Sequence, residues 1–218
     1  MSKTRDIIIE ERAFFVATLK GLKTIEWQVP TLCDGWDVED LAAHLIVRER
    51  GSLLSRAGIV LPFLHHKHDA AIRLMKHRPH AELIVLLAKP PAWVPRLGAN
   101  VIEFFVHNED LLRGGLKRKR EISAELEAKL SDFVPQLARF AFRRVIGPLE
   151  FSLRDESSGH EITRRIGRAA DDKYVHLEIA GPSPELILLM MGRGRHARVK
   201  VSGDPEAKDL YKLADIGV

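Results

Sequence analysis

The chain has 218 residues, of which 45% are hydrophobic and 29% charged, and its formal net charge is +4, values typical of a globular protein. No apolar stretch approaches the ~20 residues needed to cross a bilayer, and the N-terminal segment has acids directly after its apolar triplet, so we expect a cytoplasmic protein with no secretory signal and no membrane partner. The single cysteine, Cys33, excludes an internal disulfide and any metal site made of several cysteines.

The first elements in chain order are two predicted helices. Residues 5–22 carry apolar side chains at helical spacing. After a loop around Pro30, Asp37 is a good N-cap for a second helix, and Asp40 stands three residues later, as in a capping box. This second helix is expected to end at Gly51.

The middle of the chain is punctuated by prolines and is harder to divide. We expect short helices over residues 70–77 and 81–88. A third main helix is predicted over residues 96–113, before a Gly-Gly pair, and a fourth over residues 123–145, with a kink at Pro135.

Beyond residue 146 the pattern changes from helical to alternating. The predicted elements are strands over 149–154, 161–166 and 174–180, a helix over 183–192, a strand over 198–202 and a helix over 205–213. The turn-rich ESSG segment predicts a hairpin between the first two strands. Four long helices followed by the order β-β-β-α-β-α predict an α+β fold with two domains, residues 1–146 and 147–218.

One predicted helix carries a polar stripe inside an otherwise apolar surface. Glu103 and His107 are four residues apart and Asp110 follows three residues later, so the three side chains lie on one face, within a sector of about 60°. The remaining surface is mostly apolar, which is typical of a buried helix. Buried charges need partners, and either a metal ion or a salt bridge to a basic residue would satisfy them.

His44, on the second helix, is the residue that could complete a metal site, although it lies at the edge of that helix's apolar face. Two histidines and one carboxylate form a known catalytic zinc site with the fourth position open, and helix bundles build such sites from facing helices. The spacing alone leaves an alternative open, a buried Glu–His–Asp hydrogen-bond cluster joined by Arg48 or Arg113. The nitrogen and oxygen donors suit zinc, nickel, iron or manganese.

Two segments resemble the signatures of the mycothiol-dependent maleylpyruvate isomerase family, a branch of the DinB-like metal-binding bundles. GWDVEDLAAHL matches the pattern W-x-V-x-D-L-x-x-H, and EFFVHNED matches E-x-x-x-H-x-x-D. The resemblance implies that His44, Glu103 and His107 hold zinc and that Asp110 orients a ligand histidine or a bound water. GPSPELILLMMGR and VKVSGDPEA are similar to the family's C-terminal domain. The implied fold is a DinB-like four-helix bundle followed by a small sterol-carrier-like domain.

The resemblance also implies that the thiol mycothiol is a cofactor or co-substrate. A zinc ion with an open position lowers the pKa of a bound thiol and leaves a thiolate near neutral pH. Addition of that thiolate to a small electrophile serves isomerisation or S-transfer. Arg193, in the Gly-Arg match, is the candidate residue for steering an anionic substrate, and a solvated residue at a helix C-terminus is the alternative.

Three further features have simpler explanations. His65, His66 and His68 form a cluster that can bind a metal, but adjacent histidines on a loop more often have no ligand role. The basic run over residues 116–121 lacks an aromatic platform, which favours a solvated loop over phosphate contacts. Cys33 has no His or Lys next to it in the sequence, so we expect a structural residue.

The leading hypothesis is a zinc-dependent enzyme, a mycothiol-dependent isomerase or S-transferase whose partners are a small thiol and an electrophilic substrate. Two alternatives remain: a metal-binding module without catalysis, and a nucleic-acid-binding protein, suggested by the positive net charge. No nucleic-acid-binding motif accompanies that charge, so nucleic acid is not the expected partner. A monomer and a homodimer both fit the sequence, since an exposed apolar face on the first helix would permit a dimer.

Overall fold

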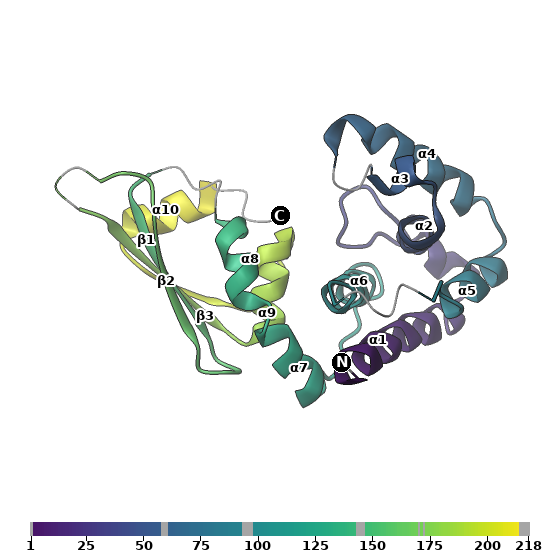
Figure 1. Cartoon of the computed structure of the whole chain (residues 1–218), viewed down its shortest axis with the longest axis horizontal. Helices are drawn as coiled ribbons and strands as arrows, with labels where there is room; N and C mark the ends of the chain where they lie inside the picture. Colours follow the sequence, from purple (N-terminus) through teal and green to yellow (C-terminus); the bar gives the residue numbers. More distant parts are fainter. Residues whose placement is uncertain are drawn as a thin grey trace. The chain divides into compact units, whose positions relative to one another are not determined.

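The computed structural model describes residues 2–57, 61–92, 98–142, 147–169, 171 and 173–213. The chain forms two compact units, Met1–Arg120 and Glu121–Val218 (Figure 1). The first unit is helical and the second contains a small mixed sheet, so the predicted α+β class is confirmed. None of the described helices is long and apolar enough to span a bilayer.

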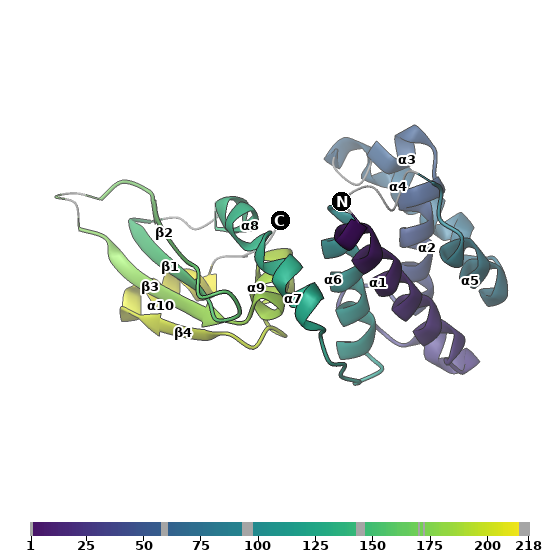
Figure 2. The ribbon, with the colours of Figure 1, turned by 60° about the horizontal axis from the view of Figure 1, so that its bottom comes forward.

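The first unit is a helical bundle around one apolar core. Its elements are α1 (Ser2–Lys20), η1 (Thr24–Gln28), α2 (Val38–Arg50), α3 (Leu53–Ala57), η2 (Pro62–Leu64), α4 (His65–Lys76), α5 (His80–Ala88) and α6 (Asn100–Arg113). Helix α1 lies along α6 and also contacts α5, while α2 packs on α4 and α5 (Figure 2). The core between them contains Phe15, Leu41, Leu45 and Phe104, which are fully buried.

Helix α2 begins where the capping residues predict. The Asp37 carboxylate accepts the N–H of Asp40 over 2.9 Å, and the Asp40 carboxylate accepts the N–H of Asp37 over 3.2 Å. This reciprocal pair satisfies two N–H groups that no helical carbonyl can reach. The helix ends before Gly51, as predicted. Because both ends are defined, the position of His44 within the helix is fixed.

Helix α4 begins earlier than the sequence pattern predicts. The helix expected over residues 70–77 starts at His65, so the three clustered histidines lie on a helix, and their prediction as a loop was wrong. His68 and Ile72, four residues apart, share its buried face. Helix α5 lies close to its predicted position. The third main helix starts at Asn100, and residues 96 and 97 of its prediction lie outside the described residues.

The second unit contains a four-stranded sheet in the order β2-β1-β3-β4. Its elements are α7 (Ala124–Ser131), α8 (Val134–Ala141), β1 (Leu149–Asp155), β2 (Glu161–Ile166), β3 (Val175–Gly181), α9 (Ser183–Leu188), the π-helical turn η5 (Leu189–Arg193), β4 (Lys200–Gly203) and α10 (Pro205–Leu213). Strands β1 and β2 form the predicted antiparallel hairpin, and β1 pairs with β3 in parallel. The predicted order of strands and helices from residue 149 onward is confirmed.

The region predicted as one kinked helix over residues 123–145 contains two helices, so that prediction was wrong. Ser123 caps α7 as expected, but the chain leaves the helix after Ser131 and α8 starts with Pro135 in its first turn. Proline has no N–H and its ring clashes with the carbonyl four residues earlier, so it interrupts a helix readily. Residues 143–145 lie outside the described residues.

The same helices explain why the two units meet at Arg120 rather than at the boundary predicted after residue 146. Both α7 and α8 pack against α9 of the second unit. Their apolar side chains, such as Leu130 and Ala138, are buried. Phe142, just after α8, stacks on Phe151 of β1 with the ring centroids 4.3 Å apart. The helices therefore complete the core of the sheet unit.

Asp155, at the end of β1, is a buried carboxylate that links three elements of the second unit. It accepts hydrogen bonds from the hydroxyls of Ser131 on α7, Ser158 in the hairpin turn and Ser183 at the start of α9. Burial alone would raise the pKa of Asp155, but these hydrogen bonds outweigh it and hold the pKa below its ordinary value of 3.8.

Replacing Asp155 with asparagine is expected to lower the free energy of unfolding by about 1.5–3 kcal/mol near neutral pH, because the hydroxyls lose a charged acceptor. The folded-state pKa lies below the unfolded one, so the stabilisation is present above about pH 4 and disappears as pH falls through the folded-state value. Denaturant unfolding of both proteins at stepwise lower pH should therefore show their stabilities converging in acid. A difference that does not change with pH would contradict this account.

Candidate metal centre

Helices α2 and α6 bring together the three side chains predicted to hold a metal. His44 Nε2 lies 3.3 Å from Glu103 Oε1, and His107 Nε2 lies 3.3 Å from the same oxygen. One ligand atom from each residue lies within 4.8 Å of the other two. Glu103 and His107 project together because residues four apart share a helix face. His44 is buried, although the sequence placed it at the edge of its apolar face.

The other nitrogen of each imidazole ring is engaged in a hydrogen bond. His107 Nδ1–H donates to Asp110 Oδ2 over 2.9 Å, and Asp110 is fully buried. His44 Nδ1 lies 2.9 Å from His68 Nε2. Each ring therefore turns its Nε2 toward Glu103. Asp110 lies behind one of the two histidines, at the position from which the sequence analysis expected it to orient a ligand.

The converging atoms have the chemistry of a cation site. Two Nε2 atoms and one carboxylate oxygen all offer lone pairs to the same small volume, and lone pairs that face one another need a proton or a metal ion between them. Zinc accepts nitrogen and oxygen donors of these types. The side chains present therefore fit a divalent metal ion.

Without a metal, a proton on His107 takes this place. Burial lowers the pKa of His44 to about 4, so its ring is neutral near pH 7. Burial also opposes protonation of His107, but hydrogen bonds with Asp110, Cys33 and Glu103 raise the pKa of His107 well above its ordinary value. The pKa of Glu103 is held well below its ordinary value, despite burial, by its histidine partners. A metal ion would therefore displace a proton as it binds.

Arg48 also contacts the cluster. Its Nε lies 3.0 Å from Glu103 Oε1, and one of its terminal nitrogens donates to Asn100 Oδ1 over 2.6 Å. This is the basic partner considered as an alternative to a metal, whereas Arg113 pairs with Glu109 instead. Arg48 neutralises Glu103 from one side and leaves the two histidine nitrogens facing the same oxygen.

The cluster is open to solvent on the side of Glu103. The Glu103 side chain keeps 20% of its surface exposed, compared with 9% for His44 and 10% for His107. A metal ion bound here would thus be held by buried imidazoles and be approached past the carboxylate.

The ends of the two ligand-bearing helices are joined by backbone contacts. Leu32 N–H donates to the carbonyl of Asp110 over 3.2 Å, and Gly115 N–H donates to the carbonyl of Pro30 over 2.6 Å. A Cβ at Gly114 would lie only 2.8 Å from Thr31 Cα and from the Pro30 carbonyl oxygen. The absence of a side chain therefore lets the C-terminal end of α6 approach the loop that leads into α2.

Two residues set aside in the sequence analysis lie against the site. His68 is buried beside His44, while His65 and His66 are exposed. The Cys33 thiol donates to Asp110 Oδ2 over 3.2 Å, and Cys33, Asp110 and His107 form a second group able to hold a metal. The spacing of His68 and Ile72 on one buried face was a usable signal, but the approach of Cys33 to residues more than 70 positions away had none.

Arg193 and a cavity belong to the second unit. Arg193 ends the π-helical turn and donates to the carbonyl of Met191 over 2.5 Å, so its predicted role in steering a substrate stays a prediction.

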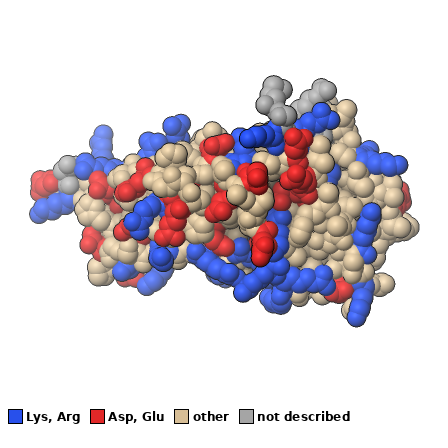
Figure 3. Space-filling view, turned by 90° about the horizontal axis from the view of Figure 1, so that it is seen from below, with Lys and Arg blue, Asp and Glu red and all other residues tan. Residues whose placement is uncertain are grey.

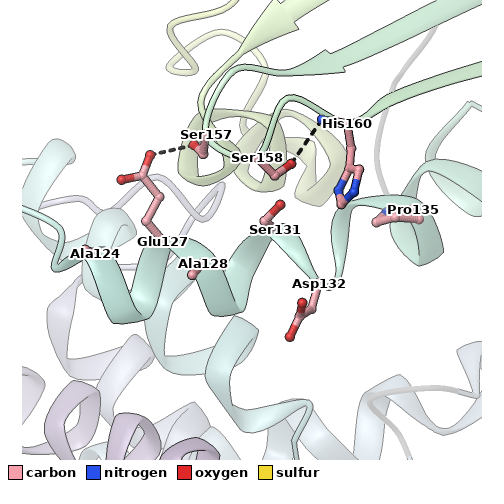
Figure 4. Close-up of a pocket in the computed structure, with 9 residues that line it drawn as sticks. All are labelled: Ala124, Glu127, Ala128, Ser131, Asp132, Pro135, Ser157, Ser158 and His160. Atoms are coloured by element: carbon pink, nitrogen blue, oxygen red, sulfur yellow. Dashed lines mark hydrogen bonds between the residues drawn. The ribbon is translucent and has the colours of Figure 1, made fainter.

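The cavity, of about 530 Å³, lies between α7 and the β1–β2 turn (Figure 4). Three serine hydroxyls line it, and each donates to a carboxylate of the protein: Ser131 and Ser158 to Asp155, and Ser157 to Glu127. The serine hydroxyls that line the cavity are therefore engaged in hydrogen bonds that stabilise the fold.

Two of the four basic residues in the run after α6 form ion pairs. The Arg120 side chain, 7% exposed, binds Glu11 and Glu109, and Arg118 pairs with Glu26. Acidic and basic side chains are interspersed over part of the face drawn in Figure 3. These pairings weaken the nucleic-acid alternative, which needs basic side chains free to reach phosphates.

Known proteins resemble this chain both in sequence and in fold. Residues 9–111 match the model of the mycothiol maleylpyruvate isomerase N-terminal domain, and no curated protein sequence matches the chain. Two solved structures of mycothiol-dependent maleylpyruvate isomerase, one of them a mutant, align over 92% of both chains with TM-scores of 0.57 and 0.56 and sequence identities of 12% and 13%. Residues 9–111 thus have the sequence pattern of the mycothiol maleylpyruvate isomerase N-terminal domain, and the chain shares the fold of mycothiol-dependent maleylpyruvate isomerase.

Proposed function

We propose that this protein is a zinc-dependent enzyme that uses a low-molecular-weight thiol, mycothiol, to isomerise a small electrophile or to transfer sulfur to it. The observation that carries the proposal is the convergence of His44 Nε2, His107 Nε2 and Glu103 Oε1, from two helices, on one partly open point. The family of the N-terminal unit supports the thiol and the isomerase class.

In this proposal the three side chains hold the metal and the surrounding groups fix their orientation. A zinc ion with an open coordination position would bind the thiol there and lower its pKa. Asp110 keeps the proton on His107 Nδ1, so that the lone pair of Nε2 stays available to a metal ion. Arg48 compensates the charge of Glu103 and positions its carboxylate. A thiolate that adds to an electrophilic carbon and later departs returns the thiol and leaves an isomer, whereas a thiolate that stays gives S-transfer.

The first test is metal analysis of protein purified without chelator and without a histidine tag. We expect about one zinc ion per chain in the wild type, loss of that ion in His44→Ala, and full retention in His66→Ala, whose imidazole is exposed on α4. A wild-type protein that holds no metal, even after reconstitution, would mean that Arg48 and a proton satisfy the cluster, and the proposal would be wrong.

The second test is the thiol dependence of the reaction. The structurally similar enzymes are named for maleylpyruvate, which is therefore the first electrophile to supply with and without mycothiol. Isomerisation that needs both the metal and the thiol supports the enzyme. Stoichiometric metal with no reaction toward a panel of small electrophiles would instead support the metal-binding module without catalysis.

A further inference from the structure

A chain of hydrogen bonds leads from the proposed metal site to the backbone of α3. His44 Nδ1 lies 2.9 Å from His68 Nε2, and His68 Nδ1 lies 3.0 Å from the carbonyl oxygen of Ser55. His44 and His68 are both buried, with 7% and 6% of their surface exposed. These three residues come from α2, α4 and α3, so the chain crosses three consecutive helices.

The proton on each nitrogen follows from the fixed end of this chain. A carbonyl oxygen can only accept, so His68 Nδ1 carries a hydrogen and donates it to Ser55. A neutral His68 then has a lone pair on Nε2, which accepts the hydrogen on His44 Nδ1. His44 is left with its lone pair on Nε2, the atom that faces Glu103. One backbone carbonyl thereby determines which nitrogen of His44 can bind a metal.

We propose that His68 is a positioning residue that holds His44 in the tautomer able to ligate the metal through Nε2. The inference rests on the proposed function and deepens it by adding a residue outside the ligand set. His68 is not itself a ligand: its Nε2 is turned to His44 Nδ1, on the side of the ring away from Glu103. Among the described residues, the groups able to hold a metal do not include His68.

The two histidine ligands consequently have partners of different charge. His107 donates a hydrogen bond to the carboxylate of Asp110, which makes the Nε2 of its ring a stronger metal ligand. His44 donates its hydrogen bond to a neutral imidazole. A divalent ion with Glu103 and Asp110 nearby is compensated by two negative charges, and Arg48 adds one positive charge beside them. A neutral residue at position 68 leaves the site net positive, whereas a carboxylate there would cancel that charge. This charge balance favours an anionic ligand such as a thiolate at the open position.

The test compares His68→Phe, His68→Gln and the control His66→Phe, in which an exposed histidine of the same helix is replaced. Two-bond proton–nitrogen NMR spectra of the imidazole rings report which nitrogen of His44 carries hydrogen, and competition with a chromophoric chelator gives the zinc dissociation constant. Loss of the positioning partner in His68→Phe should weaken zinc binding by about 10–100-fold and mix the two tautomers of His44. His68→Gln, whose amide oxygen can accept from Nδ1–H, should restore most of the affinity, and His66→Phe should match the wild type.

The inference is overturned if wild-type His44 carries its hydrogen on Nε2, or if folded His68→Phe keeps wild-type affinity and tautomer. It is equally overturned if His68→Gln binds zinc as weakly as His68→Phe, since the role would then be packing. If His68→Phe does not fold, the zinc affinity of His68→Gln and the His44 tautomer of the wild type still test the inference. A wild type that binds no zinc would reject the proposed function. The His44 tautomer of the metal-free protein would still test whether His68 fixes that tautomer.

Discussion

His107→Ala is expected to leave the protein without bound zinc and without thiol-dependent activity. The replacement removes one of three donor atoms, and it also removes the group that links Glu103 to Asp110. Loss of a partner outside the ligand set typically weakens metal binding by about 10–100-fold, so loss of a ligand should exceed that range. Elemental analysis of the purified variant, beside the wild type, gives the result directly.

A stability measurement separates loss of the ligand from damage to the fold. Zinc at about 100 times its dissociation constant should stabilise the wild type by about 2.7 kcal/mol, because it binds the folded chain. His107→Ala should gain nothing from the same addition, although its metal-free form is also less stable because the buried Asp110 loses a hydrogen-bond donor. His160→Ala, an exposed histidine of the second unit, serves as the control. Wild-type metal content in His107→Ala would show that the ligand assignment is wrong.

Glu49→Ala is expected to destabilise the first unit by about 3–5 kcal/mol, because it leaves a buried charge without its partner. Glu49 on α2 pairs with Arg12 on α1, and only 1% and 6% of the two side chains are exposed. Arg12 also donates to the carbonyl of Leu87 on α5 over 2.9 Å and lies over the Phe104 ring of α6 at 4.3 Å. One guanidinium on α1 thus contacts α2, α5 and α6. Denaturant unfolding of the metal-free protein measures the loss.

The matched controls separate the buried charge from the position. Glu10→Ala removes an exposed acid from α1 and should change stability by no more than about 0.5 kcal/mol. The double replacement Arg12→Met with Glu49→Leu removes both charges and should be near neutral, since a buried ion pair repays little more than its own desolvation. If Glu49→Ala is as mild as Glu10→Ala, water reaches Arg12 and the pair is not the buried contact described here.

The features that could be predicted from sequence were those written in local spacing. Asp37 and Asp40 define the start of α2 because a capping box needs only four residues. Glu103, His107 and Asp110 share a face because α6 is a regular helix. Alternating residues placed the strands of the second unit within two residues of their observed ends. The family signatures supplied the remaining link, between His44 and α6, that no local pattern contains.

The features that escaped prediction depend on contacts between distant parts of the chain. A helix over residues 123–145 looked continuous because its apolar pattern continues past Pro135, yet packing against α9 favours two short helices. His68 and Cys33 had no visible partner because their contacts, His44 and Asp110, lie 24 and 77 residues away. The domain boundary was misplaced for the same reason, since tertiary packing and not helical character assigns α7 and α8 to the sheet unit.

The close contact between Gly114 and the segment 30–31 has a consequence for how freely this sequence can change. The approach of the C-terminal end of α6 to the loop before α2 depends on backbone atoms and on a missing side chain. A methyl group at position 114 would therefore meet backbone atoms, so that either the end of α6 or the loop before α2 would have to shift. For a protein engineer, Gly114→Ala is thus a way to change the distance between this end of α6 and the loop before α2 without replacing His44, Glu103 or His107.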